Sequence, residues 1–259
     1  MSHCLKLSVV IPARNEARSI GQTLAEIGPA LRARNIPFEI IVVDDGSGDE
    51  TAEVVRRAQA GDDPVILVAN PGSNGFGNAV RRGLERCSGD AVAIMMADGS
   101  DSADDLVMYW DILSEGYDCA FGSRFVRGGT VIDYPMHKLV LNRLTNNFIR
   151  LLFGFAYNDV TNAFKCYRKE VIAGMQPLIS PHFNLTVEMP LKAIVRGYSY
   201  KVAPICWRNR KTGISKLKLQ EMGSRYLFIV LILWLEKHLT RGDYRREKSI
   251  TATAQKEAC

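Results

Sequence analysis

The chain has 259 residues, of which 47% are hydrophobic and 24% are charged, and its formal net charge is +5. This length can bury the core of one large α/β domain, with or without an appendage. The small basic excess does not predict nucleic-acid binding, but it suits anionic ligands or an anionic membrane surface. The six cysteines form no C-x-x-C pair, which favours a reduced, cytoplasmic compartment, and no secretory signal is expected at the N-terminus.

Apolar, β-branched runs alternate with amphipathic helical patterns in the first part of the sequence. The predicted strands cover residues 5–11, 38–43, 65–68 and 91–97, and helices follow them over 20–31, 51–58, 79–87 and 103–113. This alternation predicts a doubly wound, Rossmann-like α/β fold, with a mostly parallel sheet and helices on both faces.

The alternation breaks in the second part of the sequence. Further strands are predicted over 119–125, 159–167 and 198–207, and helices over 139–155, 169–175, 186–195 and 220–239. Residues 127–135 and the basic stretch 208–218 read as loops. We therefore expect a domain over residues 1–218, an apolar helix over 219–240, and a disordered tail over 241–259.

Polar clusters follow three of the predicted strands. They are Asn15-Glu16, Asp44-Asp45, and the group formed by Asp98, Ser100 and Asp101. Parallel strands gather their carboxyl ends at one edge of a sheet, so these carboxylates should converge and require a cation or hydrogen-bond donors. Helix capping explains any one cluster, but three together favour a functional site. Our hypothesis is that Asp98 holds a divalent cation that carries a diphosphate.

A glycine-rich turn over residues 70–79 matches neither the G-x-G-x-x-G dinucleotide fingerprint nor a P-loop. Two interpretations of this turn remain open. In one, its exposed backbone N–H groups lie near a phosphate or a base; in the other, the turn is purely structural.

Several motifs together resemble those of a known enzyme family. Residues 9–16 (VVIPARNE) and 43–51 (VDDGSGDET) resemble the family-two GT-A nucleotide-sugar glycosyltransferases. The later stretches 122–125, 158–168 and 210–217 resemble the polyprenyl-phosphate sugar synthases, the dolichol-phosphate mannosyltransferase branch. The resemblance spans residues 7–218 and implies a GT-A domain that moves a hexose, of mannose or glucose type, from a GDP- or UDP-sugar to a polyprenyl phosphate.

The resemblance also implies roles for individual residues. The nucleotide sugar would lie against Pro12, Arg14, Glu16, Val43, Asp44, Asp45, Ala97 and Asp98. Mg²⁺ or Mn²⁺ would bind at Asp98 with Ser100 and Asp101, because these cations prefer carboxylate and phosphate oxygens. Arg124, Arg210 and Lys216 would neutralise the donor diphosphate or the acceptor phosphate.

Two positions depart from the family pattern. Met96-Ala97-Asp98 stands where the family has Asp-Ala-Asp, so the first carboxylate of the metal motif is missing. Arg14 stands where the family has a tyrosine near the base. Because Met96 replaces this carboxylate, the alternative that the chain is a non-catalytic relative that binds a nucleotide remains open.

The expected reaction requires few catalytic groups from the protein. Charge that builds on the departing diphosphate would be stabilised by the cation, arginine and lysine, and in-line attack predicts inversion. A lipid phosphate is already ionised, whereas a hydroxyl acceptor would need a base, for which Asp101 is the candidate. A sugar-phosphate nucleotidyltransferase is a weaker alternative, since residues 12–16 contain no glycine.

Two apolar helical segments point to a partner surface. Residues 139–155 carry a broad apolar face, residues 226–235 are apolar all round, and basic residues at 216, 218, 225, 237 and 241 flank the second segment. These features predict a peripheral protein on the cytoplasmic face of an anionic membrane. The alternatives are packing between the two segments or contacts across a homo-oligomer.

Overall fold

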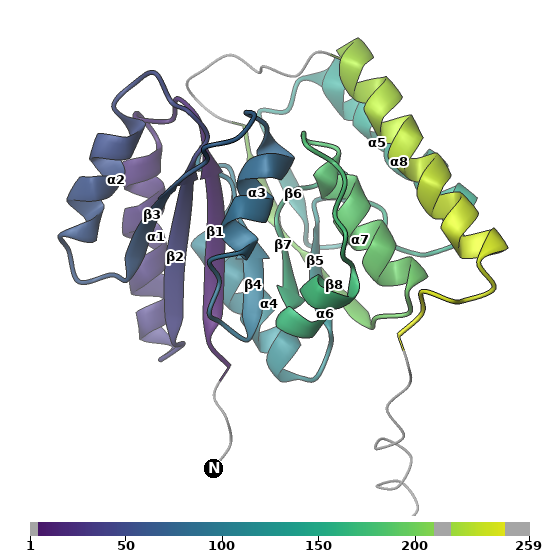
Figure 1. The fold of residues 1–259 in the computed structure, drawn as a ribbon, viewed down its shortest axis with the longest axis horizontal. Coiled ribbons are helices and arrows are strands. Elements are labelled where there is room, and N and C mark those ends of the chain that lie inside the picture. The colour runs from purple at the N-terminus through teal and green to yellow at the C-terminus, as the bar shows by residue number, and fades with distance from the viewer. Residues whose placement is uncertain (1–4, 210–218, 247–259) are drawn as a thin grey trace, which may run out of the picture.

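The structure is a computed structural model that describes residues 5–209 and 219–246. Its first part alternates strands and helices in the order that the sequence predicts (Figure 1). These elements are β1 (Leu7–Ala13), α1 (Ile20–Ala33), β2 (Phe38–Asp44), α2 (Thr51–Gln59), β3 (Val65–Ala69), α3 (Phe76–Leu84), β4 (Ala91–Ile94) and α4 (Ala103–Ser114).

The second part is less regular. It contains β5 (Cys119–Ser123), β6 (Thr130–Ile132), α5 (Met136–Phe153), β7 (Lys165–Arg168), α6 (Lys169–Gly174), α7 (Leu185–Val195), β8 (Tyr200–Pro204), β9 (Cys206–Arg208) and α8 (Leu219–Leu239). The interpretation of residues 127–135 as a loop was wrong at β6, which pairs with β9 in a small parallel sheet. The strand predicted over 198–207 divides at Ile205 into β8 and β9.

Within the described residues, the main sheet has seven strands in the order β3-β2-β1-β4-β7-β5-β8. The strands β1, β2, β3 and β4 pair in parallel, as do β5 and β8. In contrast, β7 lies between β4 and β5 and runs antiparallel to both. The prediction of a mostly parallel α/β sheet is therefore confirmed.

Both faces of the sheet are buried. Val9 and Ile11 of β1 pack in one core with residues of α1 and α4. Between them, Val10 packs in the opposite core with α3 and α7. A strand covered on both sides needs mostly apolar residues on both faces, which explains why these segments are nearly continuous apolar runs in the sequence.

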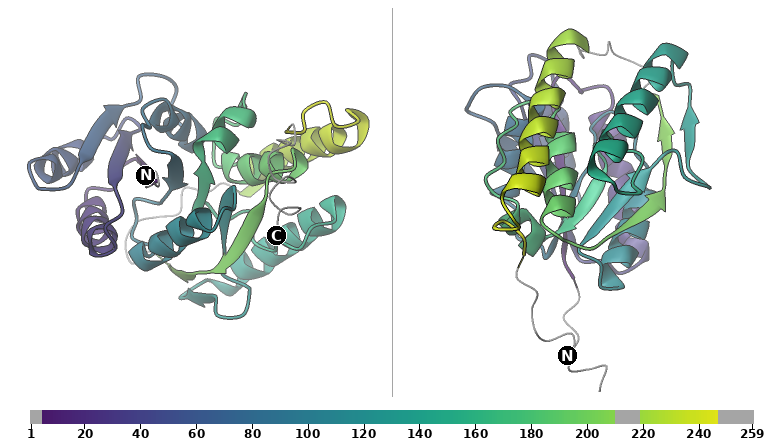
Figure 2. Two further views of the ribbon diagram at one scale, coloured as in Figure 1. Left: turned by 90° about the horizontal axis from the view of Figure 1, so that it is seen from below. Right: turned by 90° about the vertical axis from the view of Figure 1, so that its right-hand side faces the viewer.

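Helices α5 and α8 lie outside this layered body, next to α7 and in contact with each other (Figure 2). Ile229, Val230 and Leu233 of α8 are buried in the core that α7 shares. Large apolar side chains on the other faces remain exposed: Met136, Val140, Leu141, Leu144, Phe148 and Leu151 on α5, and Leu227, Phe228, Leu231, Leu235 and Leu239 on α8. Among the described helices, none combines the length and the apolar character needed to cross a bilayer.

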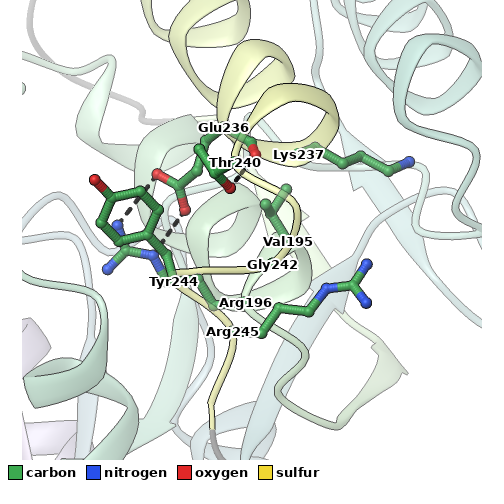
Figure 3. A pocket seen from close by; sticks show the side chains of 8 residues that line it. All are labelled: Val195, Arg196, Glu236, Lys237, Thr240, Gly242, Tyr244 and Arg245. Carbon is green, nitrogen blue, oxygen red and sulfur yellow. Dashed lines mark hydrogen bonds and ion pairs between the residues drawn. The ribbon is translucent and has the colours of Figure 1, made fainter.

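The chain folds back after α8. Figure 3 shows a hollow at the ends of α7 and α8, in which Arg196 forms an ion pair with Glu236 at 2.9 Å and stacks over Tyr244. Arg246 donates to Asp118 at 2.6 Å, and its backbone N–H donates to the carbonyl of Arg196. Residues 241–246, the start of the predicted tail, thus fasten the end of α8 to the body, whereas residues 247–259 lie outside the described part.

Candidate active site at the strand ends

The loops that follow β1, β2 and β4 meet at one edge of the sheet. Ala13 at the end of β1 is in register with Asp44 at the end of β2, and Asp45 donates its N–H to the carbonyl of Ala13 at 2.9 Å. On the other side of β1, Met95 donates its N–H to the carbonyl of Val10. Because the strands are parallel and adjacent, all three polar clusters predicted from the sequence lie at their carboxyl ends.

The loops after β1 and β2 are joined directly. Asn15, which has a positive φ of 55°, accepts a hydrogen bond from Gly48 N–H at 2.7 Å and donates its own N–H to Ser47. Glu16 donates its N–H to the hydroxyl of Thr51 at 2.8 Å. Pro12 beneath them is buried, whereas Arg14 is exposed at the rim. The two loops therefore form one continuous surface.

The two adjacent aspartates after β2 have internal partners. Asp45 is 4% exposed and accepts hydrogen bonds from Asn70 Nδ2 at 2.6 Å and from Gly75 N–H at 2.8 Å. Asp44 accepts from Ser47 N–H at 3.1 Å, and Val43 is packed in the core. The carboxylate of Asp45 thus holds the glycine-rich turn at the edge of the site, a link that the sequence did not predict.

The acidic group after β4 is compact. Asp101 is 5% exposed and accepts a hydrogen bond from Met96 N–H at 2.9 Å, while Asp98, which is half-buried, accepts from Ser100 N–H at 3.2 Å. Burial, together with the nearby charge of Asp98, raises the pKa of Asp101 to about 7. Ala97 beside them is buried, and its carbonyl accepts from Thr23.

The acidic group fits a cation that shares its coordination with a phosphate ligand. Within the described residues, no group of three or more His, Cys, Asp or Glu side chains is arranged to hold a metal. Asp98, which is half-buried, offers one carboxylate, and the buried Ser100 and Asp101 lie in the same loop after β4. Mg²⁺ commonly binds through one or two carboxylates with substrate phosphates completing its shell, so this donor set suits a phosphate-borne cation better than a resident one.

Arg124 stands at the end of β5 with its side chain 6% exposed. Its guanidinium donates to both carboxylate oxygens of Asp159, from Nε at 2.8 Å and from Nη2 at 2.6 Å, and the backbone N–H of Arg124 donates to the same carboxylate. Burial opposes the charge, but Asp159 raises the pKa of Arg124 above its ordinary value. The rings of Tyr134 and Trp207 lie 5.6 Å from the guanidinium carbon.

The segment that carries Asp159 is held from two sides. From α5, Asn146 donates to Thr161 Oγ1 at 2.8 Å and Arg143 donates to the carbonyl of Asn158 at 3.1 Å. From β7, the buried ammonium of Lys165 donates to the carbonyl of Val160 at 3.0 Å. The sequence alone predicted no role for Arg143, Asn146 or Lys165. The signal that could have found Lys165 is a lysine within an otherwise apolar stretch, AFKCY.

Two of the predicted phosphate ligands, Arg210 and Lys216, lie outside the described residues. The structure brings Arg124 and Asp101 close enough to influence each other's charge. It places Arg14, Glu16 and Asp44 along the neighbouring edge of the same surface, at the ends of β1 and β2, with Pro12 and Asp45 buried beneath them.

A mostly parallel sheet with one inserted antiparallel strand, and acidic loops at the strand ends, agree with the GT-A architecture that the sequence motifs imply. Residues 8–174 match Glycosyl transferase family 2, and the chain belongs to that family. The resemblance identified from the sequence motifs is confirmed.

Two curated relatives share 31% identity with the chain. One is the polyprenol monophosphomannose synthase of Mycolicibacterium smegmatis, aligned over 215 residues that cover 81% of this chain and 80% of the relative. The other is the dolichol-phosphate mannosyltransferase of Pyrococcus furiosus, aligned over 219 residues, 83% of this chain but 60% of that longer protein.

Solved structures share the fold at lower identity. The glucosyl-3-phosphoglycerate synthase of Mycobacterium tuberculosis, in a complex with Mn²⁺, UDP-glucose and phosphoglyceric acid, superposes with a TM-score of 0.69 at 19% identity. The match covers 90% of this chain and 79% of that protein, and it supports the GT-A architecture.

Proposed function

We propose that this glycosyltransferase moves a hexose of mannose or glucose type from a nucleoside-diphosphate sugar to a polyprenyl phosphate, with inversion at the anomeric carbon. The observation that carries this proposal is the 31% identity, over four fifths of the chain, to relatives named for polyprenol and dolichol phosphate. The pairing of acidic strand ends with a buried arginine agrees with it, since donor and acceptor both carry phosphate.

The acidic group after β4 is the proposed site for Mg²⁺ or Mn²⁺. Asp98 would hold the cation, with Ser100 and Asp101 beside it, and a bound cation would neutralise charge on the departing diphosphate. The Mn²⁺ complex of the structural neighbour supports the use of a divalent cation. Asp101 faces the backbone of Met96, which favours a supporting role over that of a base.

Arg124 is the proposed phosphate ligand among the described residues. Asp159 fixes the plane of its guanidinium, and a guanidinium with a fixed plane suits bidentate recognition of phosphate oxygens. Arg210 and Lys216 remain proposed partners of Arg124.

The exposed faces of α5 and α8 are the proposed membrane-docking surface. Their apolar side chains adjoin the basic residues Arg150, Arg225, Lys237 and Arg241, a combination that suits the anionic cytoplasmic leaflet. Peripheral docking would bring the strand ends to a lipid acceptor. A homo-oligomer that covers the same faces is the rival explanation.

Transfer assays separate the possible acceptors. The purified protein is incubated with labelled GDP-mannose or UDP-glucose, Mn²⁺, and either a polyprenyl phosphate or the matching polyprenol. We expect a lipid-linked sugar phosphate only from the phosphate acceptor. Product only from the alcohol would contradict the proposal. A separate comparison of the melting temperatures with GDP and with UDP identifies the preferred nucleotide.

A further inference from the structure

Lys165, the first residue of β7, is buried beneath the candidate site with 1% of its surface exposed. Its ammonium contacts three backbone carbonyls: those of Val160 at 3.0 Å and Thr186 at 3.3 Å, and that of Asn162. It has no ion pair with a carboxylate at contact distance among the described residues. Burying an ammonium is costly, and an apolar side chain would fill this place at lower cost, so the charge itself calls for an explanation.

The carbonyls that Lys165 binds belong to two different segments. Val160 and Asn162 lie in the loop that begins with Asp159, and Thr186 lies in the first turn of α7. Lys165 therefore ties the Asp159 loop to α7 on one side, as Asn146 ties it to α5 on the other. The position of Asp159, and through it the plane of the Arg124 guanidinium, depends on these ties.

The charges around Arg124 also support a role for Lys165 at the site. Asp159 fully balances Arg124 in a two-bond pair, and Asp101 adds a further buried carboxylate that interacts with both Arg124 and Lys165. A protonated Lys165 lowers the net negative charge around Arg124, beneath a site proposed to receive phosphate. This reduces a repulsion that would be strong in a buried environment.

We propose that Lys165 is a positioning residue for phosphate recognition, which fixes the Asp159–Arg124 pair through its contacts with the Asp159 loop and lowers the negative charge below that pair. This proposal rests on the proposed function. The phosphate group can come from the nucleoside diphosphate of the donor or from the lipid phosphate of the acceptor. Burial lowers the pKa of Lys165 to about 7, while Asp159 and Asp101 oppose that shift and Arg124 adds to it.

Two substitutions separate the contacts from the charge. Lys165→Met removes both, whereas Lys165→Gln removes the charge but keeps two N–H donors on a slightly shorter side chain. Lys192→Met is the matched control: Lys192 is also buried, pairs with Glu188 at 2.8 Å, and lies on α7 beside a second hollow, which is separate from that in Figure 3. Thermal unfolding establishes which variants are folded, and Lys165→Gln carries the test if Lys165→Met does not fold.

Two measurements distinguish the sources of phosphate. Calorimetry gives the Kd of GDP and UDP with Mn²⁺, and steady-state kinetics with a short isoprenyl phosphate gives the acceptor KM and kcat. We expect both Lys165 variants to weaken one of the two, Kd or KM, roughly tenfold, and Lys192→Met to leave both within about twofold of the wild type.

Unchanged Kd and KM in a folded Lys165 variant would overturn the proposal, as would equal losses in Lys192→Met. If the wild-type protein transfers no sugar to the isoprenyl phosphate, the proposed function fails. The nucleotide Kd, measured without turnover, then decides the role of Lys165 alone.

Discussion

Leu144 and Leu151 protrude from α5 with 63% and 85% of their surfaces exposed, so they give a direct test of membrane docking. Full burial of a leucine side chain contributes about 2 kcal/mol, so covering these two exposed fractions in lipid would contribute about 3 kcal/mol. The double variant Leu144→Asp/Leu151→Asp loses this contribution and adds two charges that an anionic membrane repels. We expect its binding to vesicles to weaken at least roughly a hundredfold, since about 1.4 kcal/mol corresponds to tenfold.

Co-sedimentation with vesicles of anionic phospholipid measures this binding. Ile66→Asp is the matched control, because Ile66 is 39% exposed on β3, at the opposite edge of the sheet from α5 and α8 (Figure 1). All three substituted positions are exposed, so the melting temperatures should stay close to that of the wild type. Equal vesicle binding by the double variant and the wild type would refute the docking surface, and a change from oligomer to monomer would favour the rival explanation.

Three further substitutions test the site and the stability of the sheet. Asp98→Asn should lower kcat at least about a hundredfold and abolish the Mn²⁺-dependent part of nucleoside-diphosphate binding; retained Mn²⁺ dependence would exclude Asp98 as the ligand. Arg124→Lys cannot reproduce the two-bond pair with Asp159, so kcat/KM should fall by roughly ten- to a hundredfold, and an unchanged value would contradict a phosphate role. Burial would raise the pKa of Glu39, but bonds from Lys6, Ser8 and Ser88 hold it at about 2, below its ordinary 4.5. The stabilisation, up to roughly 3 kcal/mol, is present above pH 4.5 and is lost as the pH falls toward 2, so Glu39→Gln should flatten the acid limb of the unfolding curve; an unchanged limb would contradict the assignment.

The sequence predicted the first part of the fold well because its signals are local. Each strand from β1 to β4 is a short, mostly apolar run. A polar residue ends β2 or directly follows β1 and β3, whereas apolar residues follow β4, so the strand predicted over 91–97 ends earlier, at Ile94. Parallel pairing then requires the acidic residues after β1, β2 and β4 to share one edge, which follows from the strand type without knowledge of the strand order.

The contacts in the second part depend on residues far apart in the sequence. Arg124 was assigned to phosphate, but its pairing with Asp159, 35 residues later, follows from the placement of β7 between β4 and β5. Strand β6 has three residues, too few for a periodic pattern to reveal it. The sequence also did not reveal that Asp45 holds Gly75, because hydropathy patterns do not report side-chain partners.

The insertion of β7 has a consequence for the independence of the two parts of the chain. Strand β4 belongs to the first part, β5 to the second, and β7 hydrogen-bonds to both, so the two parts are interlocked through a strand taken from late in the sequence. A fragment ending after α4 would expose the fully buried edge of β4, a ready template for intermolecular pairing. The first part of the chain is therefore not a separable module: its sheet is complete only when the second part has folded against it.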